Sequence, residues 1–123
     1  MPPRIAVRNI SLFERPVPFA KPFRFGAVVI TSSVQAFVQA EIEVEGKGTS
    51  VGASAELMAA KWFDKRADLS PEQTIGELRR SLLIARELYL GRSGFETAFG
   101  LHAACIRAQV EACAKEDIPP LGA

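Results

Sequence analysis

The spacing of the apolar residues changes once along this chain, and that change limits the folds open to it. From Val34 to Val44 every second residue is apolar, which is typical of a strand with one buried face. Phe37 is the exception on the polar face, and it either meets a covering element or makes a cross-strand pair. After Leu69 the apolar residues recur at helical spacing. Strands followed by helices indicate an α+β fold.

Two further strands are predicted before Val34. The run Ala27–Thr31 is rich in β-branched residues, and the serines at 32–33 separate it from the next strand, which predicts a hairpin. An earlier strand, Arg4 to Glu14, changes the phase of its alternation near Asn9. Such a change predicts a β-bulge.

Two capped helices are predicted in the second half. Ser70 and Gln73 form a capping box, and Gly91 ends the first helix. Ser93 and Glu96 repeat the box before the second helix. The apolar stripe of the first helix is Ile75, Leu78, Leu82, Ala85 and Tyr89. The stripe of the second is Phe95, Phe99, His102, Ile106, Val110 and Cys113.

The predicted architecture is a three-stranded antiparallel β-meander followed by an antiparallel helical hairpin. A length of 123 residues suits one domain, 1–123. Within it we expect the sheet at about 4–46, a loop at 47–68 and the helices at about 70–117.

Composition and charge limit the classes of partner that the chain can bind and the cellular compartment that we expect for it. Hydrophobic residues make up 48% of the chain and its net charge is +1, so it lacks the excess positive charge that binding to nucleic acid favours. The longest apolar stretch is far shorter than the roughly 20 residues that a membrane span needs. Charged residues also interrupt 1–16, where an export signal would need an apolar run. We expect a cytoplasmic protein that binds neither nucleic acid nor membrane.

Cys105 and Cys113 are predicted to remain reduced. Eight residues on one helix separate them by about 12 Å, whereas a disulfide needs Cα atoms within about 7 Å. We expect both thiols on or beside the sheet-facing side of the last helix, with Arg107, Glu111 and Lys115 on its wet side.

Two motifs that suggest chemistry have simpler interpretations. The stretch Gly46–Gly52 resembles a phosphate cradle, but its third glycine is one position late and it follows a meander strand, so a flexible turn is favoured. His102 and Cys105 have a spacing that could place two ligands on one metal ion, but a structural zinc site needs four. A packed core histidine is the favoured interpretation of His102.

Two aromatic segments are the strongest candidates for function. In the first, Arg15 to Phe25, three prolines are expected to prevent regular ladder pairing, and three phenylalanines are too apolar for a free loop. It either folds over its own sheet or faces a ligand or partner. The second, Gly52 to Arg66, combines small residues with Trp62. It is either a short helix and linker or a second contact loop.

The order of these parts resembles a known family. The bulged strand, the loop R-P-V-P-F-A-K-P-F-R-F-G, the strand ending E-V-E-G-K-G, the turn G-A-S-A-E-L and K-W-F-D-K before two helices resemble the N-terminal capping domain of the enolase superfamily, closest to its mandelate racemase and muconate lactonizing branch. The resemblance covers essentially the whole chain, from Arg4 to Leu121. Its motifs are architectural.

The resemblance implies a function as a substrate-specificity cap. The family's barrel supplies the Mg²⁺ ligands and the acid/base residues that act on a carboxylate substrate, in racemase, dehydratase or cycloisomerase reactions. It needs about 200 residues or more, so the resemblance implies a truncated chain that carries no catalytic or metal residue and no cofactor, with Mg²⁺ in the absent barrel. The implied substrate-binding residues are Phe19, Phe23, Arg24, Phe25, Glu56, Lys61 and Trp62.

Two alternatives stay open at the sequence level. The chain could be a stand-alone module that binds a small ligand between its aromatic loops. It could also be an interaction subunit that docks on a partner, or forms a homo-oligomer, through the same loops.

Overall fold

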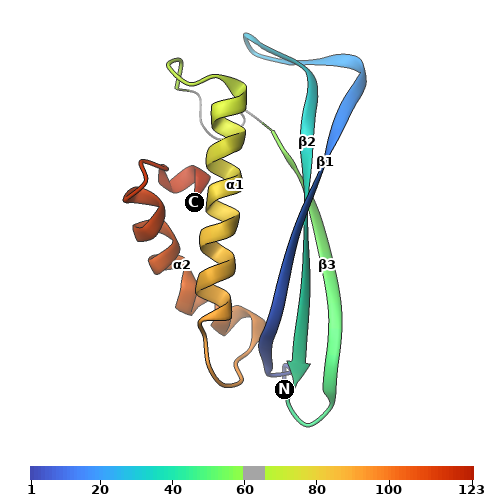
Figure 1. Ribbon diagram of the computed structural model, residues 1–123, viewed down its shortest axis with the longest axis vertical. Coiled ribbons are helices and arrows are strands. Elements are labelled where there is room, and N and C mark those ends of the chain that lie inside the picture. Colours follow the sequence, from blue (N-terminus) through green and yellow to red (C-terminus); the bar gives the residue numbers. More distant parts are fainter. Residues whose placement is uncertain (60–65) are drawn as a thin grey trace.

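The fold is a three-stranded sheet followed by two helices, which confirms the predicted α+β class (Figure 1). The computed structural model describes residues 1–59 and 66–123, without the side chains of Phe25 and Leu121. The elements are β1 (Ile5–Phe25), β2 (Val28–Val44), β3 (Gly48–Met58), α1 (Pro71–Leu90), α2 (Ala98–Ala114) and the short 3₁₀ helix η1 (Pro120–Gly122).

The sheet is an antiparallel meander with the order β1-β2-β3, but its strands differ from the predicted ones. The serines at 32–33 form no turn, because β2 runs through them without a break. Ser33 instead donates its hydroxyl to the main-chain oxygen of Met58 at 2.8 Å. The turn lies earlier, at residues 26–27, where Gly26 adopts a φ of +57° that few other residues tolerate.

The third strand, β3, occupies 11 residues, half of the segment predicted as a loop at 47–68. It pairs with β2 from Val44↔Gly48 to Val34↔Met58. A tight turn connects the two strands, with Gly46 at a φ of +73° and the Lys47 amide bonded to the Val44 carbonyl at 2.9 Å. The Gly46–Gly52 stretch is therefore a hairpin turn and the start of a strand.

The bulge predicted near Asn9 is confirmed. The register of β1 on β2 passes from Val7↔Ile42 to Asn9↔Glu41, which leaves Arg8 as the extra residue. One extra residue reverses the alternation. Ile5 and Val7 before the bulge therefore share the inner face of the sheet, the face toward the helices, with the apolar residues that follow it.

Helix α1 begins as predicted, and α2 does not. Ser70 and Gln73 form the capping box of α1, and Gly91 is its C-cap. Thr97 caps α2 by accepting from the Gly100 amide at 2.9 Å, so the predicted Ser93 box is wrong. Glu96 is bridged to Ile5 at the edge of β1, and it does not sit in a first helical turn.

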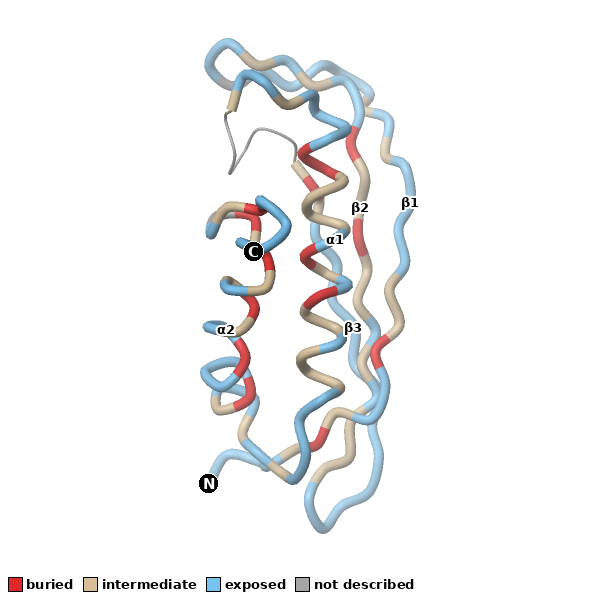
Figure 2. Tube along the Cα trace, turned by 60° about the vertical axis from the view of Figure 1, so that its left-hand side comes forward, coloured by how far each residue is buried: buried red, intermediate tan, exposed pale blue. Residues whose placement is uncertain are grey.

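The later start of α2 also changes which of its residues are buried. Its buried residues are Leu101, Cys105, Gln109 and Cys113. Of the predicted stripe only Cys113 is buried, while Phe99 is 79% and Ile106 is 41% exposed. His102 is exposed, so its interpretation as a core histidine is wrong. Buried positions recur along one side of each helix (Figure 2).

Both cysteines are free and buried, as predicted. Arg107 and Glu111 form an exposed ion pair at 3.1 Å, which confirms the predicted wet side of α2. Cys113 belongs to a core cluster with Ile84 and Ile118, where α1, α2 and the C-terminal segment meet. A second cluster joins the sheet to α1 through Ala36, Met58 and Ile75.

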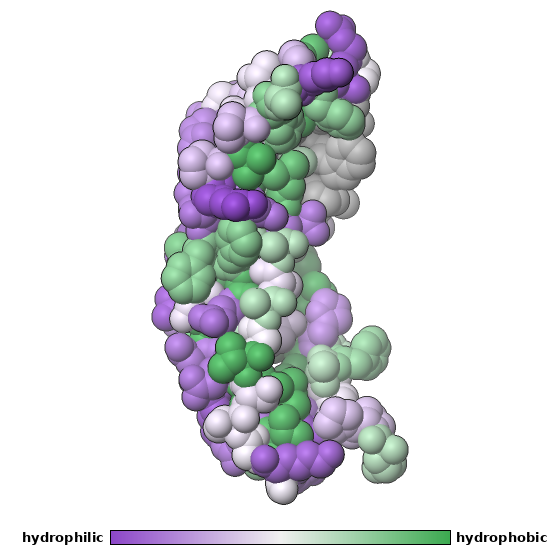
Figure 3. Space-filling model, turned by 90° about the vertical axis from the view of Figure 1, so that its right-hand side faces the viewer, coloured by the Kyte–Doolittle hydropathy of each residue, from purple (hydrophilic) through white to green (hydrophobic). Residues whose placement is uncertain are grey.

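The outer face of the sheet, away from the helices, mixes apolar and charged side chains (Figure 3). Phe37 stands opposite Phe13 on β1, which settles its role as a cross-strand pair. The Arg15 guanidinium lies 5.6 Å from the centre of the Phe37 ring. Phe13 and Val51 remain 57% and 59% exposed.

Candidate functional site

The β1–β2 hairpin extends past the end of β3 and carries four of the predicted site residues. The last row of three strands contains Val34 and Met58, and beyond it β1 and β2 continue as a two-stranded ribbon. Figure 1 shows this ribbon at the end of the molecule where α1 begins. Its described side chains range from half-buried, as at Val28 and Ile30, to exposed, as at Arg24 and Val29.

The prediction that three prolines prevent regular ladder pairing here is wrong for the first two and is confirmed at Pro22, which lies where the ladder is interrupted. Pro16 pairs with Val34 and Pro18 with Ser32. β1 is an edge strand, and two prolines two residues apart can both turn their missing N–H groups toward its free edge. The ladder is interrupted only after Pro18, where Phe19 to Pro22 stand opposite Thr31 alone before Phe23 pairs with Ile30.

The hairpin residues differ in how they face solvent. Phe19 is half-buried within the interruption, Phe23 is 49% exposed and Arg24 is exposed. Phe23 and Arg24 are consecutive on an extended strand, so their side chains leave on opposite faces. A ligand on one face of the ribbon therefore meets either the ring or the charge. The backbone of Phe25 pairs with Val28, and its side chain is outside the described part.

Glu56 does not lie with the hairpin residues. It is opposite Ala36, six residues along β2 from the partner of Phe23, a separation of about 20 Å. Its side chain lies on the inner face, at a pocket of about 150 Å³ that Leu78 of α1 also lines. Lys61 and Trp62 lie outside the described residues.

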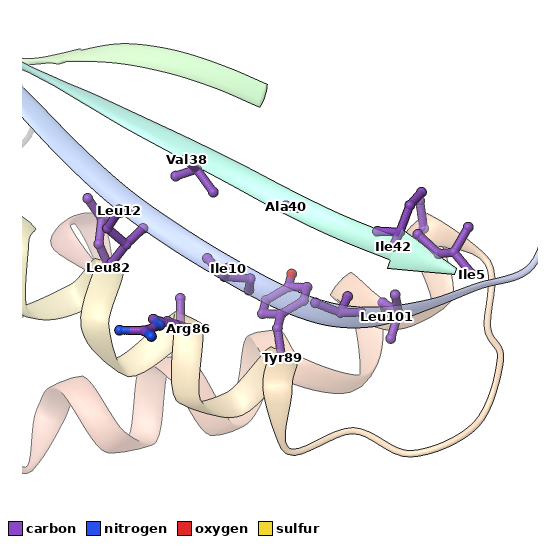
Figure 4. A pocket seen from close by; sticks show the side chains of 13 residues that line it. Ile5, Ile10, Leu12, Val38, Ala40, Ile42, Leu82, Arg86, Tyr89 and Leu101 are labelled. Carbon is purple, nitrogen blue, oxygen red and sulfur yellow. The ribbon is translucent and has the colours of Figure 1, made fainter. Parts of the chain in front are cut away.

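The structure contains a larger pocket that the sequence did not indicate. It has a volume of about 300 Å³, is half-open and lies between the inner face of the sheet and the two helices (Figure 4). Strand residues from Ile5 to Leu12 line one side, and Leu82, Arg86 and Tyr89 of α1 line the other. Leu82, Arg86 and Tyr89 are at helical spacing in the sequence. This spacing was the signal that could have predicted Arg86 on the apolar face of α1.

Arg86 is the one charged residue among the described residues that line this pocket. Its Nε is buried and has no hydrogen-bond partner among the described residues. The other arginines of α1 are paired: Arg79 donates to Glu14 of β1 at 2.8 Å, and Arg80 donates to Glu116 at 2.8 Å. The hydrogen bonds from Arg79 to its carboxylate partners, Glu14 first, raise the pKa of its guanidinium above the usual value.

A third pocket, of about 220 Å³, lies between the helices. Tyr89, His102 and Cys105 line it, and the Tyr89 hydroxyl is 3.5 Å from His102 Nδ1. Burial raises the pKa of the Tyr89 hydroxyl. Burial also raises the pKa of the Cys113 thiol, on the same helix as His102. A thiol kept protonated is a poor nucleophile.

Over residues 1–59 and 66–123, no group of three or more His, Cys, Asp or Glu side chains could hold a metal ion. The described residues therefore offer no donor set that fits Mg²⁺. Within the same ranges, no helix combines the length and apolar character needed to cross a membrane.

No protein family model, curated protein or solved structure matches this chain.

Proposed function

We propose that this chain is the substrate-selecting cap of a metal-dependent, cytoplasmic enzyme of the enolase superfamily that acts on a carboxylate. The observation that carries the proposal is the two-stranded ribbon at the end of β1 and β2, with an exposed Phe23 and Arg24 on a sheet backed by capped helices. The Phe23 ring on one face of the ribbon and the Arg24 guanidinium on the other suit a ligand whose apolar body packs on the ring while its negative charge reaches the opposite face around the hairpin end.

The cap itself would select and shield. Phe23 and the half-buried Phe19 offer apolar surface that excludes water from a neighbouring site. Arg24 offers a guanidinium that can bind a carboxylate through two parallel hydrogen bonds. The Mg²⁺ ligands and the proton-transferring groups would belong to a barrel, which takes about 200 residues or more and is not within this sequence.

The first test is to read the genomic DNA that follows codon 123. In-frame codons for a β/α barrel support the proposal, and a stop codon directly after Ala123 in an intact genome contradicts it. This DNA sequence can be determined without any folded protein, so the result does not depend on the stability of a variant.

The second test substitutes the hairpin in the parent enzyme. Phe23→Ala should lower kcat/KM for the preferred carboxylate about tenfold, because one buried aromatic contact is worth at least that factor. Phe13→Ala is the matched control, since Phe13 is also a half-exposed phenylalanine of β1 but lies on the outer face of the three-stranded part. Equal kcat/KM values for both variants would remove Phe23 from the site.

An alternative is a stand-alone ligand-binding or interaction module that dimerises through its aromatic hairpin. It is favoured by the exposure of apolar side chains on both strands of the ribbon, 49% for Phe23 and 45% for Val29. Sizing chromatography at increasing concentration separates the alternatives. A dimer that Phe23→Asp abolishes supports this module, and a monomer at all concentrations excludes dimerisation.

A further inference from the structure

We propose that the free edge of β3 pairs with the same edge of a second copy of this chain, so that an antiparallel dimer shares one continuous sheet. The strand order is β1-β2-β3, and no described strand lies beyond β3. The proposal does not depend on the cap function, because Phe23 and Arg24 lie on the part of the β1–β2 hairpin that extends past the end of β3.

The hydrogen bonds of Ile5 show which main-chain groups of β3 face the free edge. Ile5 exchanges main-chain bonds with Glu96 at 2.7 and 2.9 Å, so its N–H and C=O point away from β2. Bonded and non-bonded pairs alternate along an antiparallel ladder. Val44, opposite Ile5, therefore points toward β3 and bonds to Gly48. By the same alternation, every second residue of β3 from Gly48 onward bonds to β2, and the residues between them point to the free edge. These outward-facing residues are Thr49, Val51, Ala53, Ala55 and Leu57.

The outward-facing groups are accessible to a partner. Residues 48–56 are all exposed, and Figure 1 shows no described helix over the first half of β3. Of the outward-facing set, only Leu57 has another main-chain partner among the described residues, since its carbonyl accepts from the Ala59 amide at 2.9 Å. A row of free N–H and C=O groups on an exposed strand is a template for a further strand.

The other edge of the sheet is protected against such pairing. β1 contains the bulge at Arg8 and the prolines Pro16 and Pro18, and Ile5 is already bridged to Glu96. Prolines and bulges are usual devices that stop an edge strand from pairing. In contrast, β3 has no proline, no lysine and no shift in its register over residues 48–58. Pairing of β3 with its copy therefore closes at a dimer, because neither copy offers a second unprotected edge.

A register centred on Ala53 matches the strand with its copy. Ala53 then lies opposite its counterpart, and Val51 lies opposite Ala55. These residues are outward-facing and share one face of the sheet, so bonding groups meet and each face stays continuous. The outward-facing residues of both copies can form about ten main-chain hydrogen bonds, as in a typical interface.

The charges near the strand favour the antiparallel direction. Lys47 precedes β3 and Glu56 lies near its end, and both are exposed. In this register Glu56 faces Ser50 of the second copy, near Lys47 of that copy, so opposite charges approach at each end of the interface. Glu45 is already paired with Arg4. A parallel pairing would place Glu56 beside Glu56 and Lys47 beside Lys47.

The size of the interface sets the strength of the dimer. A standard interface buries about 800 Å² on each partner with about 20–30 residues, so the 11 residues of β3 correspond to roughly 350 Å² on each copy. This area is smaller than that of permanent dimers. We expect a dissociation constant on the order of 10–100 μM, so the dimer forms only at high protein concentration.

The first test is sedimentation equilibrium of the full chain between about 1 and 500 μM, with amide hydrogen exchange at both ends of this range. The chain should pass from monomer to dimer and form no larger species. The amides of Val51, Ala53 and Ala55 should exchange at least about tenfold more slowly in the dimer, because they enter the new ladder. The amides of Gly52 and Ser54 bond to β2 in the monomer and should change less.

Substitutions at Ala53 test the register. Ala53→Lys and Ala53→Glu place like charges opposite each other at the centre of the interface, so each variant alone should be monomeric. An equimolar mixture of the two should form a heterodimer, because opposite charges then meet. Ala103→Lys adds the same charge at an exposed position of α2 and should leave the dimer unchanged. Phe23→Asp should also leave it unchanged.

Each contrary result overturns the proposal. A monomer over the whole range, a dimer that Ala53→Lys does not weaken, or a mixture with Ala53→Glu that stays monomeric would exclude this pairing. A dimer lost in Phe23→Asp and kept in Ala53→Lys would place the interface at the hairpin. Slow exchange of the Ala53 amide at the lowest concentration would show that the chain itself covers this edge. If circular dichroism shows that Ala53→Lys does not fold, Ala53→Pro replaces it, since proline removes only an outward-facing N–H.

Discussion

Gln109 of α2 donates its side-chain amide to the main-chain oxygen of Ser81 in α1 at 2.8 Å, in the buried contact between the two helices. The same Nε2 lies 3.6 Å from Cys113 Sγ, and Oε1 is buried without a partner among the described residues. The helix pair is therefore joined by a polar side chain that is satisfied at one end only.

Replacement of Gln109 should separate packing from hydrogen bonding. Gln109→Met keeps the shape, loses one hydrogen bond and removes the unpaired oxygen, so we expect a change within about 1 kcal/mol. Gln109→Ala also leaves a cavity and should lose about 2–3 kcal/mol. Urea denaturation measures both, and equal losses for the two variants would show that the hydrogen bond dominates.

The Cys113 thiol should make the protein less stable in alkali. Its pKa is raised by burial in the folded chain, whereas an unfolded thiol ionises near pH 8.5. Above that pH the folded state retains a proton that the unfolded state releases, so the free energy of unfolding falls as pH rises toward the folded pKa. The measurement is chemical denaturation at several pH values between about 7 and 9.5. This range lies below the pH at which tyrosine ionises.

Cys113→Ala tests this assignment. The informative quantity is the change in the free energy of unfolding with pH, and not its value at one pH. The variant should be less stable at pH 7 because it leaves a cavity, yet its stability should fall less between pH 8 and 9.5. Cys105→Ala removes the other buried thiol and keeps the Cys113 slope. An unchanged slope in Cys113→Ala would assign the alkaline loss to another group.

Deletion of Arg8 should destabilise the sheet far more than its substitution. Without the extra residue, Ile5 and Val7 would turn to the outer face, at an expected cost of about 2–4 kcal/mol for two half-buried side chains. Arg8→Ala keeps the bulge and loses the exposed ion pair with Glu43 and the contact of the guanidinium with the Phe95 ring at 5.9 Å, each worth no more than about 1 kcal/mol. Chemical denaturation of both variants gives the comparison.

The isolated chain should not catalyse proton exchange. Proton abstraction next to a carboxylate requires stabilisation of an enolate-like intermediate, usually by a metal and a positioned base. We expect no Mg²⁺-dependent deuterium incorporation at the α-position of hydroxy-carboxylates above the protein-free rate. Incorporation above that rate would assign catalysis to this chain itself.

The sequence predicts structure correctly where the alternation of apolar and polar side chains determines it. The bulge was visible because Ile5, Val7, Ile10 and Leu12 must share one face. Strand β3 was missed because Gly48 to Ala55 offers small, exposed residues with almost no apolar alternation. Its strand conformation depends on hydrogen bonds to β2, which no local pattern records.

The second helix shows a different limit. Ser93 and Glu96 have the spacing of a capping box, but the backbone of Glu96 pairs with Ile5, 91 residues earlier. That tertiary pairing prevents a helix from starting there and leaves Thr97 as the cap. The pocket at Arg86 was missed for a similar reason, since a cavity depends on how far a helix stands from a sheet.

The interruption of β1 between Pro18 and Phe23 has a consequence for how this molecule can vary. Four residues there stand opposite Thr31 alone, so the segment can lengthen or shorten without moving either strand by one step. The length of this segment is therefore uncoupled from the folding of the sheet. Insertions and deletions can reshape the hairpin end while the rest of the domain keeps its sequence.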